Sequence, residues 1–513
     1  MKMTVDAEPR ELVLREFEAH TASGRAQIEE MRQGTATYKG VPIKFGYLPK
    51  YFSQEGFAKL KSDLEQAWRI LVRVIEEYLD QPDYRALFGF PPELEEMILR
   101  RPAYSTLLPV CRLDIFLNEE TGDFKFCEFN ADGSSAMNEN AELYRTYKNT
   151  LLYRQMNERY EQEMFELFDS WVETFLRIYA EGQRTGQGQK TAEKQILAQE
   201  RNAAQETDRQ ADPAGESGPR ALPAVAIVDF LEKGSSAAEF TAFREAFERA
   251  GCPAYVAEIR TMRYENGRLL TEEGHPVDAV YRRAVTSDIL AHRDEVQPFL
   301  QAVRDRSVCL IGDFCTQVVH DKVLFRILHD SRTAAFLSQE DKAFIAAHVP
   351  FTAMLTRQTA DREDVRDNKD KWIIKPRDSY GAHGIYPGRL CSEEEWKAQL
   401  DRRADTDYIL QEFVTPYRTE NIYFGPAKPQ APAADGEKIP VPEAAVEESE
   451  SPAPKAQDRE FADRPRWQSF SNMTGVYLYG GRVAGIYSRA SVTPIISVEG
   501  DEHEMATIVL KKR

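Results

Sequence analysis

The chain has 513 residues, 42% of them hydrophobic, which is enough for two or three domains with sizeable cores. With 66 basic and 84 acidic residues the formal net charge is −18, so the sequence lacks the basic surface that nucleic acid or an anionic membrane would bind. A charged N-terminal stretch and the lack of any long apolar run predict a cytoplasmic protein without a membrane span.

Two segments are set apart by composition. Residues 182–220 and 426–466 contain almost no large apolar side chains, so we expect them to be disordered insertions. Between and around them we expect four folded blocks: a helical region with one β-hairpin at 1–181, an α/β domain at 221–335, a nucleotide-binding region at 336–425 and a C-terminal hairpin at 467–513.

The spacing of apolar residues predicts a mixed α/β fold. We expect helices where they recur every three or four positions, over 57–79, 141–180 and 239–251. We expect strands where short apolar runs are bounded by turn residues, at 111–117, 124–131, 224–230, 254–259, 279–285, 371–376 and 408–414. The Gly480-Gly481 pair predicts a tight primed turn in a hairpin over 475–489.

The hairpin predicted at 111–131 carries polar residues on one face. Arg112 and Asp114 alternate with apolar neighbours on its first strand, as Glu128 and Asn130 do on its second. If the loop has an odd number of residues, Asp114 lies opposite Glu128 and Arg112 opposite Asn130, about 4.5–5.5 Å apart. Gly122 favours a loop of three or five residues.

Two carboxylates and an amide oxygen at one place suit a hard cation such as Mg²⁺. Arg112 would then face the negative charge of a transferred phosphoryl group. The alternative is a solvated sheet face with ordinary cross-strand ion pairs.

A second set of candidates surrounds the strand at 371–376. Lys375 ends this strand as a compact cation suited to nucleotide phosphates. The loop that follows would cover the phosphates with backbone N–H groups and exclude water, through Ser379, Tyr380, Gly381 and Gly384. The alternative is a surface lysine followed by a turn.

Further nucleotide-binding candidates lie on either side of this strand. Lys322, near the start of a helical stretch, could reach a phosphate, although a lone lysine there is more often solvated. The strand at 408–414 could offer backbone groups to an adenine edge, at Gln411, Glu412, Phe413 and Val414. Its alternative is an ordinary core strand.

Three spans resemble the glutathionylspermidine synthase family and its relatives among circularly permuted ATP-grasp proteins: residues 112–135, 371–385 and 475–491. The element Asp-x13-Glu-x-Asn, followed much later by Lys-Pro and a Gly-rich loop, is similar to their permuted order, in which the metal ligands come first. The resemblance implies an ATP-grasp core built from the first, third and fourth blocks, with a pre-ATP-grasp-like domain at 221–335.

The resemblance also implies roles for single residues. It implies Mg²⁺ ligands at Asp114, Glu128 and Asn130, a transition-state arginine at Arg112, phosphate lysines at Lys322 and Lys375, and adenine contacts at 411–414. The late Arg489 corresponds to an arginine that binds phosphate or the acyl intermediate. We therefore expect an ATP-dependent carboxylate–amine ligase that works through an acyl phosphate.

The resemblance supports the chemistry better than the substrates. Ala-Asp-Gly-Ser-Ser follows the Glu-x-Asn element where the family has other residues, and nothing resembles the amidase domain of bifunctional synthases. The carboxylate, the amine and the oligomeric state stay open. So do two other functions, a nucleotide-binding scaffold without turnover and an ATP-dependent phosphotransferase.

One acidic stretch offers an alternative metal site, formed by Glu499, Asp501, Glu502 and Glu504. We expect this stretch to be a solvated end of the chain instead.

Overall fold

The computed structural model describes residues 2–38, 40–184, 222–233, 237–379, 383–423, 466–497 and 501–513. The predicted insertions lie outside these residues, except that 182–184 continue a helix and Arg466 is the first residue of a strand. Within the described residues, no helix is long and apolar enough to cross a membrane.

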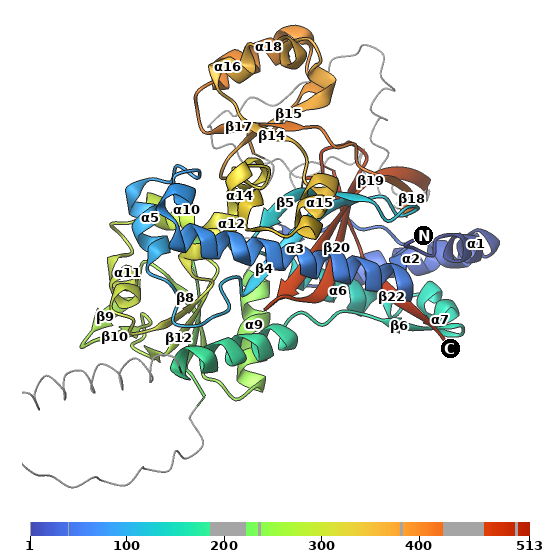
Figure 1. The fold of residues 1–513 in the computed structure, drawn as a ribbon. Coiled ribbons are helices and arrows are strands. Elements are labelled where there is room, and N and C mark those ends of the chain that lie inside the picture. The colour runs from blue at the N-terminus through green and yellow to red at the C-terminus, as the bar shows by residue number, and fades with distance from the viewer. Residues whose placement is uncertain are drawn as a thin grey trace, which may run out of the picture.

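A six-stranded antiparallel sheet forms the centre of the protein (Figure 1). Its strands lie in the order β21-β20-β19-β4-β5, and β18 also pairs with β19. They are β4 (Val110–Leu117), β5 (Phe124–Asn130), β18 (Arg418–Tyr423), β19 (Arg466–Tyr479), β20 (Arg482–Ser491) and β21 (Glu502–Met505). The β19–β4 pairing joins two segments that are far apart in the sequence into one sheet.

A smaller antiparallel sheet lies above the central sheet in Figure 1, in the order β14-β17-β15-β16. Its strands are β14 (Thr352–Met354), β15 (Trp372–Pro376), β16 (Tyr386–Pro387) and β17 (Tyr408–Glu412). Helices α16 and α18 cover its outer face, where Trp396 of α18 shares a buried cluster with Trp372 and Ile374 of β15.

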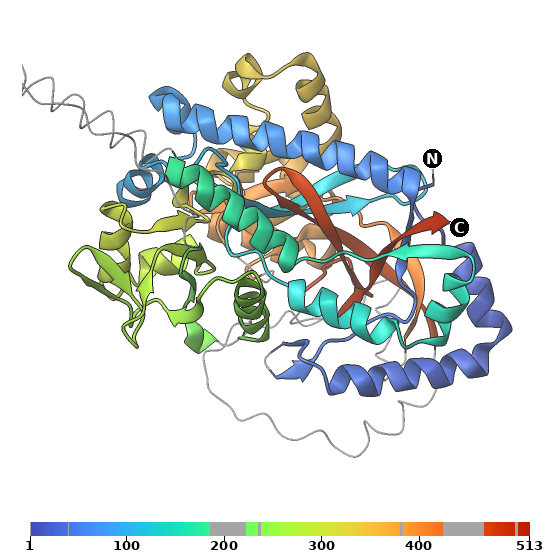
Figure 2. The same cartoon turned by 90° about the horizontal axis from the view of Figure 1, so that it is seen from below.

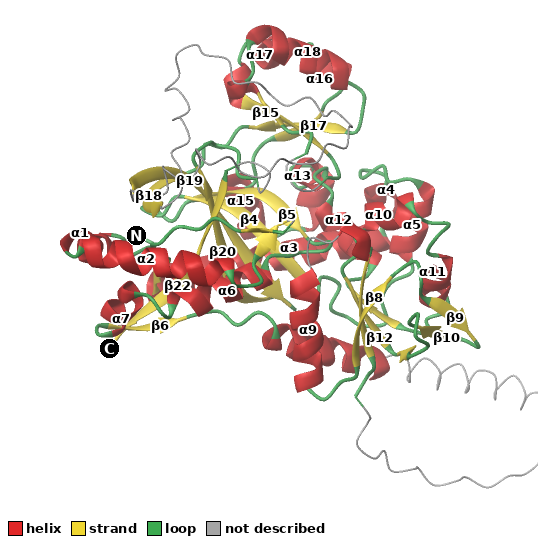
Figure 3. Ribbon diagram, turned by 180° about the vertical axis from the view of Figure 1, so that it is seen from behind, coloured by secondary structure: helices red, strands yellow, loops and turns green. Residues whose placement is uncertain are grey.

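The block at 221–335 contains the parallel sheet that its alternating pattern predicts, in the order β13-β12-β7-β8. Figure 3 shows these strands as a group beside the central sheet. The strands of this block are β7 (Val225–Asp229), β8 (Ala254–Glu258), β9 (Arg263–Glu265), β10 (Arg268–Leu270), β11 (Pro276–Val277), β12 (Ala279–Arg282) and β13 (Cys309–Ile311), of which β9 to β11 form a small sheet of their own.

Two further sheets contain strands from the N-terminal part of the chain, and one of them also contains the C-terminal strand. β3 (Lys50–Ser53) and β6 (Tyr160–Glu163) flank β22 (Thr507–Lys512), and β1 (Thr37–Tyr38) pairs with β2 (Val41–Pro42). The α-helices are α1 (Ala7–Arg15), α2 (Phe17–Arg32), α3 (Gln54–Asp80), α4 (Pro82–Arg85), α5 (Pro92–Leu99), α6 (Met137–Tyr147), α7 (Leu151–Asn157), one at 169–184, α9 (Ala237–Arg249), α10 (Thr286–Ala291), α11 (Gln297–Arg304), α12 (Gln317–His320), α13 (Leu324–Ile327), α14 (Ser331–Phe336), α15 (Gln339–His348), α16 (Arg357–Ala360), α17 (Glu363–Arg366) and α18 (Glu393–Arg403).

The long helix α3 confirms the helix predicted at 57–79. Ser53 caps it by accepting a hydrogen bond from the Gly56 N–H, and its buried residues recur at helical spacing. Figure 2 shows the β19–β20 hairpin between α3 and the helix at 169–184. Gly480 and Gly481 form its two-residue turn with φ of +52° and +83°, which confirms the predicted primed turn.

The prediction of one long helical stretch over 141–180 is wrong. The chain forms α6, α7, β6 and then the helix at 169–184, because Thr150 caps a new helix with its side chain and 160–163 pairs with β22. The partner strand begins at Thr507, so local spacing cannot reveal it.

The β4–β5 hairpin has the predicted pairs, with Asp114 opposite Glu128 and Arg112 opposite Asn130. The odd-numbered loop that we expected to produce these pairs is wrong. The loop at 118–123 has six residues, an even number. The register shifts by one residue after Asp114, opposite Cys127, and this β-bulge brings the two polar faces together.

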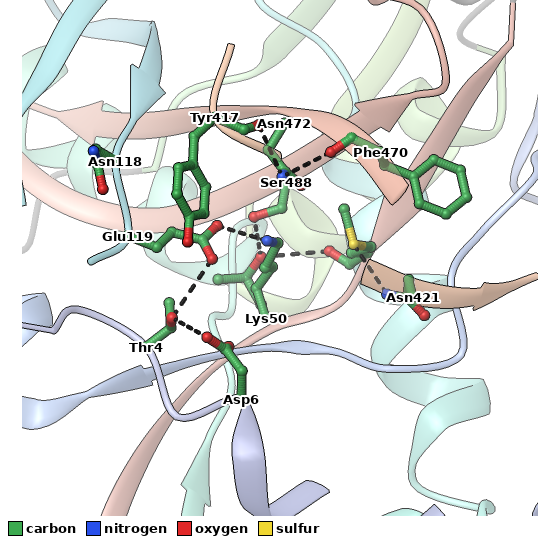
Figure 4. Close-up of polar contacts among 12 residues, drawn as sticks. Thr4, Asp6, Lys50, Asn118, Glu119, Tyr417, Asn421, Phe470, Asn472 and Ser488 are labelled. Atoms are coloured by element: carbon green, nitrogen blue, oxygen red, sulfur yellow. Dashed lines mark hydrogen bonds and ion pairs between the residues drawn. The ribbon is translucent and has the colours of Figure 1, made fainter. Parts of the chain in front are cut away.

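A buried ion pair holds the loop of this hairpin in place (Figure 4). Lys50 Nζ, at the start of β3, lies 2.6 Å from Glu119 Oε1, and both side chains are buried. The Met3 N–H donates to the Glu119 carbonyl over 2.7 Å. The N-terminal segment and β3 therefore fix the end of the strands that carry the polar face.

We predict that Lys50→Met lowers the free energy of unfolding by about 3 kcal/mol, because the Glu119 carboxylate would stay buried without its cation. Urea denaturation measures the change. The double variant Lys50→Met/Glu119→Gln should recover most of the loss, and equal loss in the single and double variants would contradict this account.

Candidate active site

A cavity of about 500 Å³ lies where the central sheet, the smaller sheet and the α/β block meet. Most of the predicted site residues line it: Arg112, Glu128, Asn130, Lys322, Lys375, Ser379, Gln411, Glu412, Phe413, Val414 and Arg489. Asp114 lies behind the wall and is fully buried. Gly384 is described but does not line the cavity, whereas Tyr380 and Gly381 lie outside the described residues.

The Asp114 carboxylate is enclosed by three hydrogen-bond donors. Arg112 donates to both of its oxygens over 2.8 and 3.1 Å, and the Asn130 side-chain amide donates over 3.0 Å. Arg489, on β20, adds a contact of 2.5 Å. Asp114 therefore fixes both predicted arginines beside the cavity.

Glu128 is paired with the first predicted lysine. Lys322 Nζ lies 2.8 Å from Glu128 Oε1 and also donates to the Ser379 carbonyl over 2.9 Å. Burial alone would raise the pKa of Glu128, but the charge and hydrogen bond of Lys322, together with the nearby His320 and Lys375, lower that pKa to about 2. Glu128 is thus an anion, and Lys322 is held at the loop that follows β15.

The second predicted lysine, Lys375, lies at the end of β15 and is also buried. Its Nζ donates to Gln411 Oε1 over 2.8 Å and to the Cys127 carbonyl over 3.4 Å. Cys127 belongs to the bulge of the β4–β5 hairpin, so Lys375 links the smaller sheet to the central one.

Two backbone N–H groups of the predicted adenine strand are already paired within the protein. Glu412 and Phe413 line the cavity, but their N–H groups donate to the carbonyls of Phe351 and Lys371. This happens because β17 is an inner strand of its sheet, with β14 on one side and β15 on the other. These two backbone donors therefore do not face an adenine edge.

The cavity residues fit Mg²⁺ only in part. Glu128 and Asn130 present side-chain oxygens, which Mg²⁺ prefers, whereas Asp114 is enclosed by its donors. In the described part of the chain, no group of three His, Cys, Asp or Glu side chains could hold a metal ion. The residues therefore fit a Mg²⁺ that completes its shell with waters and nucleotide phosphates.

Several cations gather at this end of the cavity. Arg112, Lys322, Lys375 and Arg489 lie around the carboxylates of Asp114 and Glu128, and Arg489 also lies 3.7 Å from Glu502. The phosphates of a nucleotide triphosphate could pair with these cations.

The opposite end of the cavity is acidic. The prediction that the acidic stretch near the C-terminus is solvated is wrong for Glu502 and Glu504. Glu502 and Glu504 lie on β21 and line the cavity, because β21 pairs with β20. Glu504 is buried, and the side chain of Glu502 is 7% exposed. Glu139, on α6, lines the same end, and nothing in the sequence singled it out. Glu499 lies outside the described residues.

Comparison with known proteins identifies the fold. No family model and no curated protein sequence matches the chain. A glutathione synthetase-like effector from Globodera pallida, in its apo form, is similar in structure, with a TM-score of 0.52 and 9% identity over 95% of this chain and 96% of that chain. D-alanyl-alanine synthetase A from Vibrio cholerae O1 biovar eltor str. N16961 aligns at 11% identity over 56% of this chain and 87% of that chain. Its TM-score of 0.24 is too low to show a shared fold.

The first similarity covers nearly the whole chain, so the two proteins share a fold, a mixed α/β arrangement with several sheets. It does not single out the glutathionylspermidine synthase family, and it does not test the circular permutation.

The pKa of Glu128 gives a prediction about stability. An unfolded glutamate has a pKa of about 4.3, so the lowered folded value means that ionised Glu128 stabilises the fold above that pH. This contribution is lost as the pH falls toward 2. We predict that Glu128→Gln costs about 2 kcal/mol at neutral pH and progressively less in acid.

Urea denaturation of both proteins from about pH 6 to about pH 3 measures this difference. Lys322→Met should remove most of the pH dependence, because it removes the cation that lowers the pKa. A difference that stays constant with pH would contradict the ion pair.

Proposed function

We propose that this protein is an ATP-dependent ligase that activates a carboxylate as an acyl phosphate and joins it to an amine. The observation that carries the proposal is the meeting of Lys322 and Lys375, from separate segments, with the carboxylates of one hairpin in a single cavity. The four cations there and the fold shared with a glutathione synthetase-like effector support a nucleotide rather than a neutral ligand.

The residues around the hairpin would exchange partners when nucleotide binds. Lys322 and Lys375 now contact Glu128 and Gln411, and phosphate oxygens are stronger partners for an ammonium group than an amide oxygen is. Arg489 would likewise turn from Asp114 to phosphate. Mg²⁺, held by Glu128 and Asn130 and by Asp114 once Arg489 leaves, would neutralise charge on the phosphates.

The chemistry then needs position and positive charge more than a strong acid or base. A substrate carboxylate attacks the γ-phosphorus, ADP leaves, and the amine displaces phosphate from the acyl phosphate. Arg112 and Arg489 would stabilise the oxyanions of both steps. The cavity walls would exclude water, which otherwise hydrolyses the intermediate.

The exchange of partners predicts that Mg²⁺ and ATP bind cooperatively. We expect ATP to bind at least about tenfold more tightly with Mg²⁺ than with EDTA, because the phosphates release carboxylates that the metal needs. Arg489→Met should weaken ATP binding but strengthen binding of Mn²⁺ alone, since it removes one of the three donors that enclose Asp114.

Calorimetry measures the ATP affinities, and electron paramagnetic resonance measures Mn²⁺ binding. Arg482→Met, an exposed arginine at the start of the same strand, is the matched control and should change neither. Weaker Mn²⁺ binding in Arg489→Met would contradict the exchange.

The ligase reaction has its own test, a screen of ATP turnover with carboxylates and amines, read as phosphate release and product mass. We expect turnover to require both substrates, and we expect Lys375→Met to lower kcat about 100-fold or more. Lys371→Met, an exposed lysine just before β15, should leave turnover unchanged. Phosphate transfer without an amine would indicate a phosphotransferase, and absence of any turnover a nucleotide-binding scaffold.

A further inference from the structure

One wall of the cavity is apolar. Five apolar side chains from two segments of the chain line the cavity there: Tyr38 and Ile43 near the N-terminus, and Pro494, Ile495 and Ile496 in the loop between β20 and β21. We call these five residues the apolar wall. Four of them are partly exposed, whereas Ile496 is buried. Single exposed apolar side chains are common on proteins, but several that line one cavity indicate a binding surface.

Polar contacts hold the two parts of the apolar wall side by side. Directly after Ile43 the chain runs along β21. The Glu504 N–H donates to the Lys44 carbonyl over 2.8 Å, and the Gly46 N–H donates to the Glu504 carbonyl over 2.9 Å. Lys44 Nζ also lies 3.1 Å from Asp501 Oδ1, just before β21. The two parts of the wall therefore keep their relative position without a ligand.

The loop that carries the second part of the wall is also held by its own side chains. The Thr493 hydroxyl donates to the Ile495 carbonyl over 2.8 Å, and the Thr493 N–H donates to the Ser491 hydroxyl over 3.2 Å. Such local hydrogen bonds favour one turn conformation of the loop. Ile495 therefore keeps its place at the cavity, although it is only partly buried.

The chemistry of the apolar wall fits hydrocarbon. Removal of apolar surface from water is favourable in proportion to its area, so an alkyl or aryl group would bind against these side chains. Of the five, only Tyr38 carries a polar atom. A polar body, such as that of a hydrophilic peptide, would lose water here and gain few hydrogen bonds.

Arg489 could orient such a ligand by its charged end. Its cross-strand partners are Met473 on β19, which also lines the cavity, and Glu504 on β21, which is bonded to the chain beside Ile43. The Arg489 guanidinium lies 3.9 Å from the Met473 sulfur, and the loop of Ile495 continues from the strand of Arg489. A carboxylate bound to Arg489 would thus have apolar side chains beside it. Ligand sites commonly combine apolar walls with a few charged groups in this way.

We propose that the apolar wall binds the hydrocarbon body of the carboxylate substrate, so that the protein acts on an aliphatic or aromatic acid. That this acid is activated as an acyl phosphate rests on the function proposed above. Binding of the acid itself requires only the wall and the cation that holds its carboxylate.

The wall is tested without nucleotide, by titrating the full-length protein with straight-chain acids from butanoate to octanoate and following the ligands by NMR. We expect the affinity to rise about fourfold for each added methylene, as hydrocarbon burial predicts. Ile495→Asn should flatten this rise and weaken octanoate binding at least about tenfold. Thermal melting shows that the variant is folded. Leu14→Asn, at an exposed leucine of α1 that does not line the cavity, is the matched control and should bind as the wild type does.

Three results would overturn the proposal: equal affinity for butanoate and octanoate, an unchanged rise in folded Ile495→Asn, or equally tight binding of 1-octanol. Tighter binding of octylamine than of octanoate would also overturn it and assign the wall to an amine. Octanoate binding that depends on Ile495 in a protein without ATP turnover would keep the wall and reject the ligase. Turnover with hydrophilic acids alone would keep the ligase and reject the wall, so the two proposals fail separately.

Discussion

The arrangement of this protein depends on neutralising two carboxylates, of which Asp114 is fully buried and Glu128 partly buried. Asp114 and Glu128 lie side by side on the β4–β5 hairpin, and removing their charges from water without partners would be costly. Arg112 and Asn130 of the same hairpin contact Asp114. The other partners come from elsewhere in the chain: Arg489 from the C-terminal hairpin and Lys322 from the segment between α12 and α13. The cavity therefore lies where these segments meet.

Adjacent strands also give the cavity its two electrostatic ends. Arg489 on β20 and Glu504 on β21 are direct cross-strand partners, so the sign of the charge changes within one strand spacing. The cationic end includes Lys375 from the smaller sheet and Lys322 from the segment between α12 and α13, whereas Glu139 of α6 lines the acidic end. Arg489 contacts both Asp114 and Glu502 and so links the two ends.

Local spacing was enough to predict the parts of the site that lie on regular elements. Alternation identified the polar face of Arg112 and Asp114, and a lysine at a strand end identified Lys375. The predicted cross-strand pairs of the hairpin were correct, although the predicted loop length was not. The bulge at Cys127, which compensates for the even-numbered loop, has no local signal in the sequence. The fold class followed from the parallel α/β block and the two glycines of the primed turn.

Residues whose setting depends on distant partners were missed or misjudged. Glu139 lies in a polar helical stretch that looks solvated, and only packing against β21 and α9 encloses it. Glu502 and Glu504 alternate with His503 and Met505, a strand pattern that we passed over because the stretch is so acidic. A strand period within a charged stretch is the signal that could have found them.

The order of the segments has a consequence for how the protein is made. Asp114 and Arg489 are 375 residues apart, so a ribosome would release the hairpin, with Arg112 beside Asp114, long before the second arginine exists. Until then the nascent hairpin would carry a polar face that cannot be buried, and strand β4 would lack β19 as its neighbour. Pairing of strands so far apart in the sequence slows folding. Until β19 is made, the edge of β4 stays unpaired. Activity of the kind proposed would therefore begin only after the last hairpin docks.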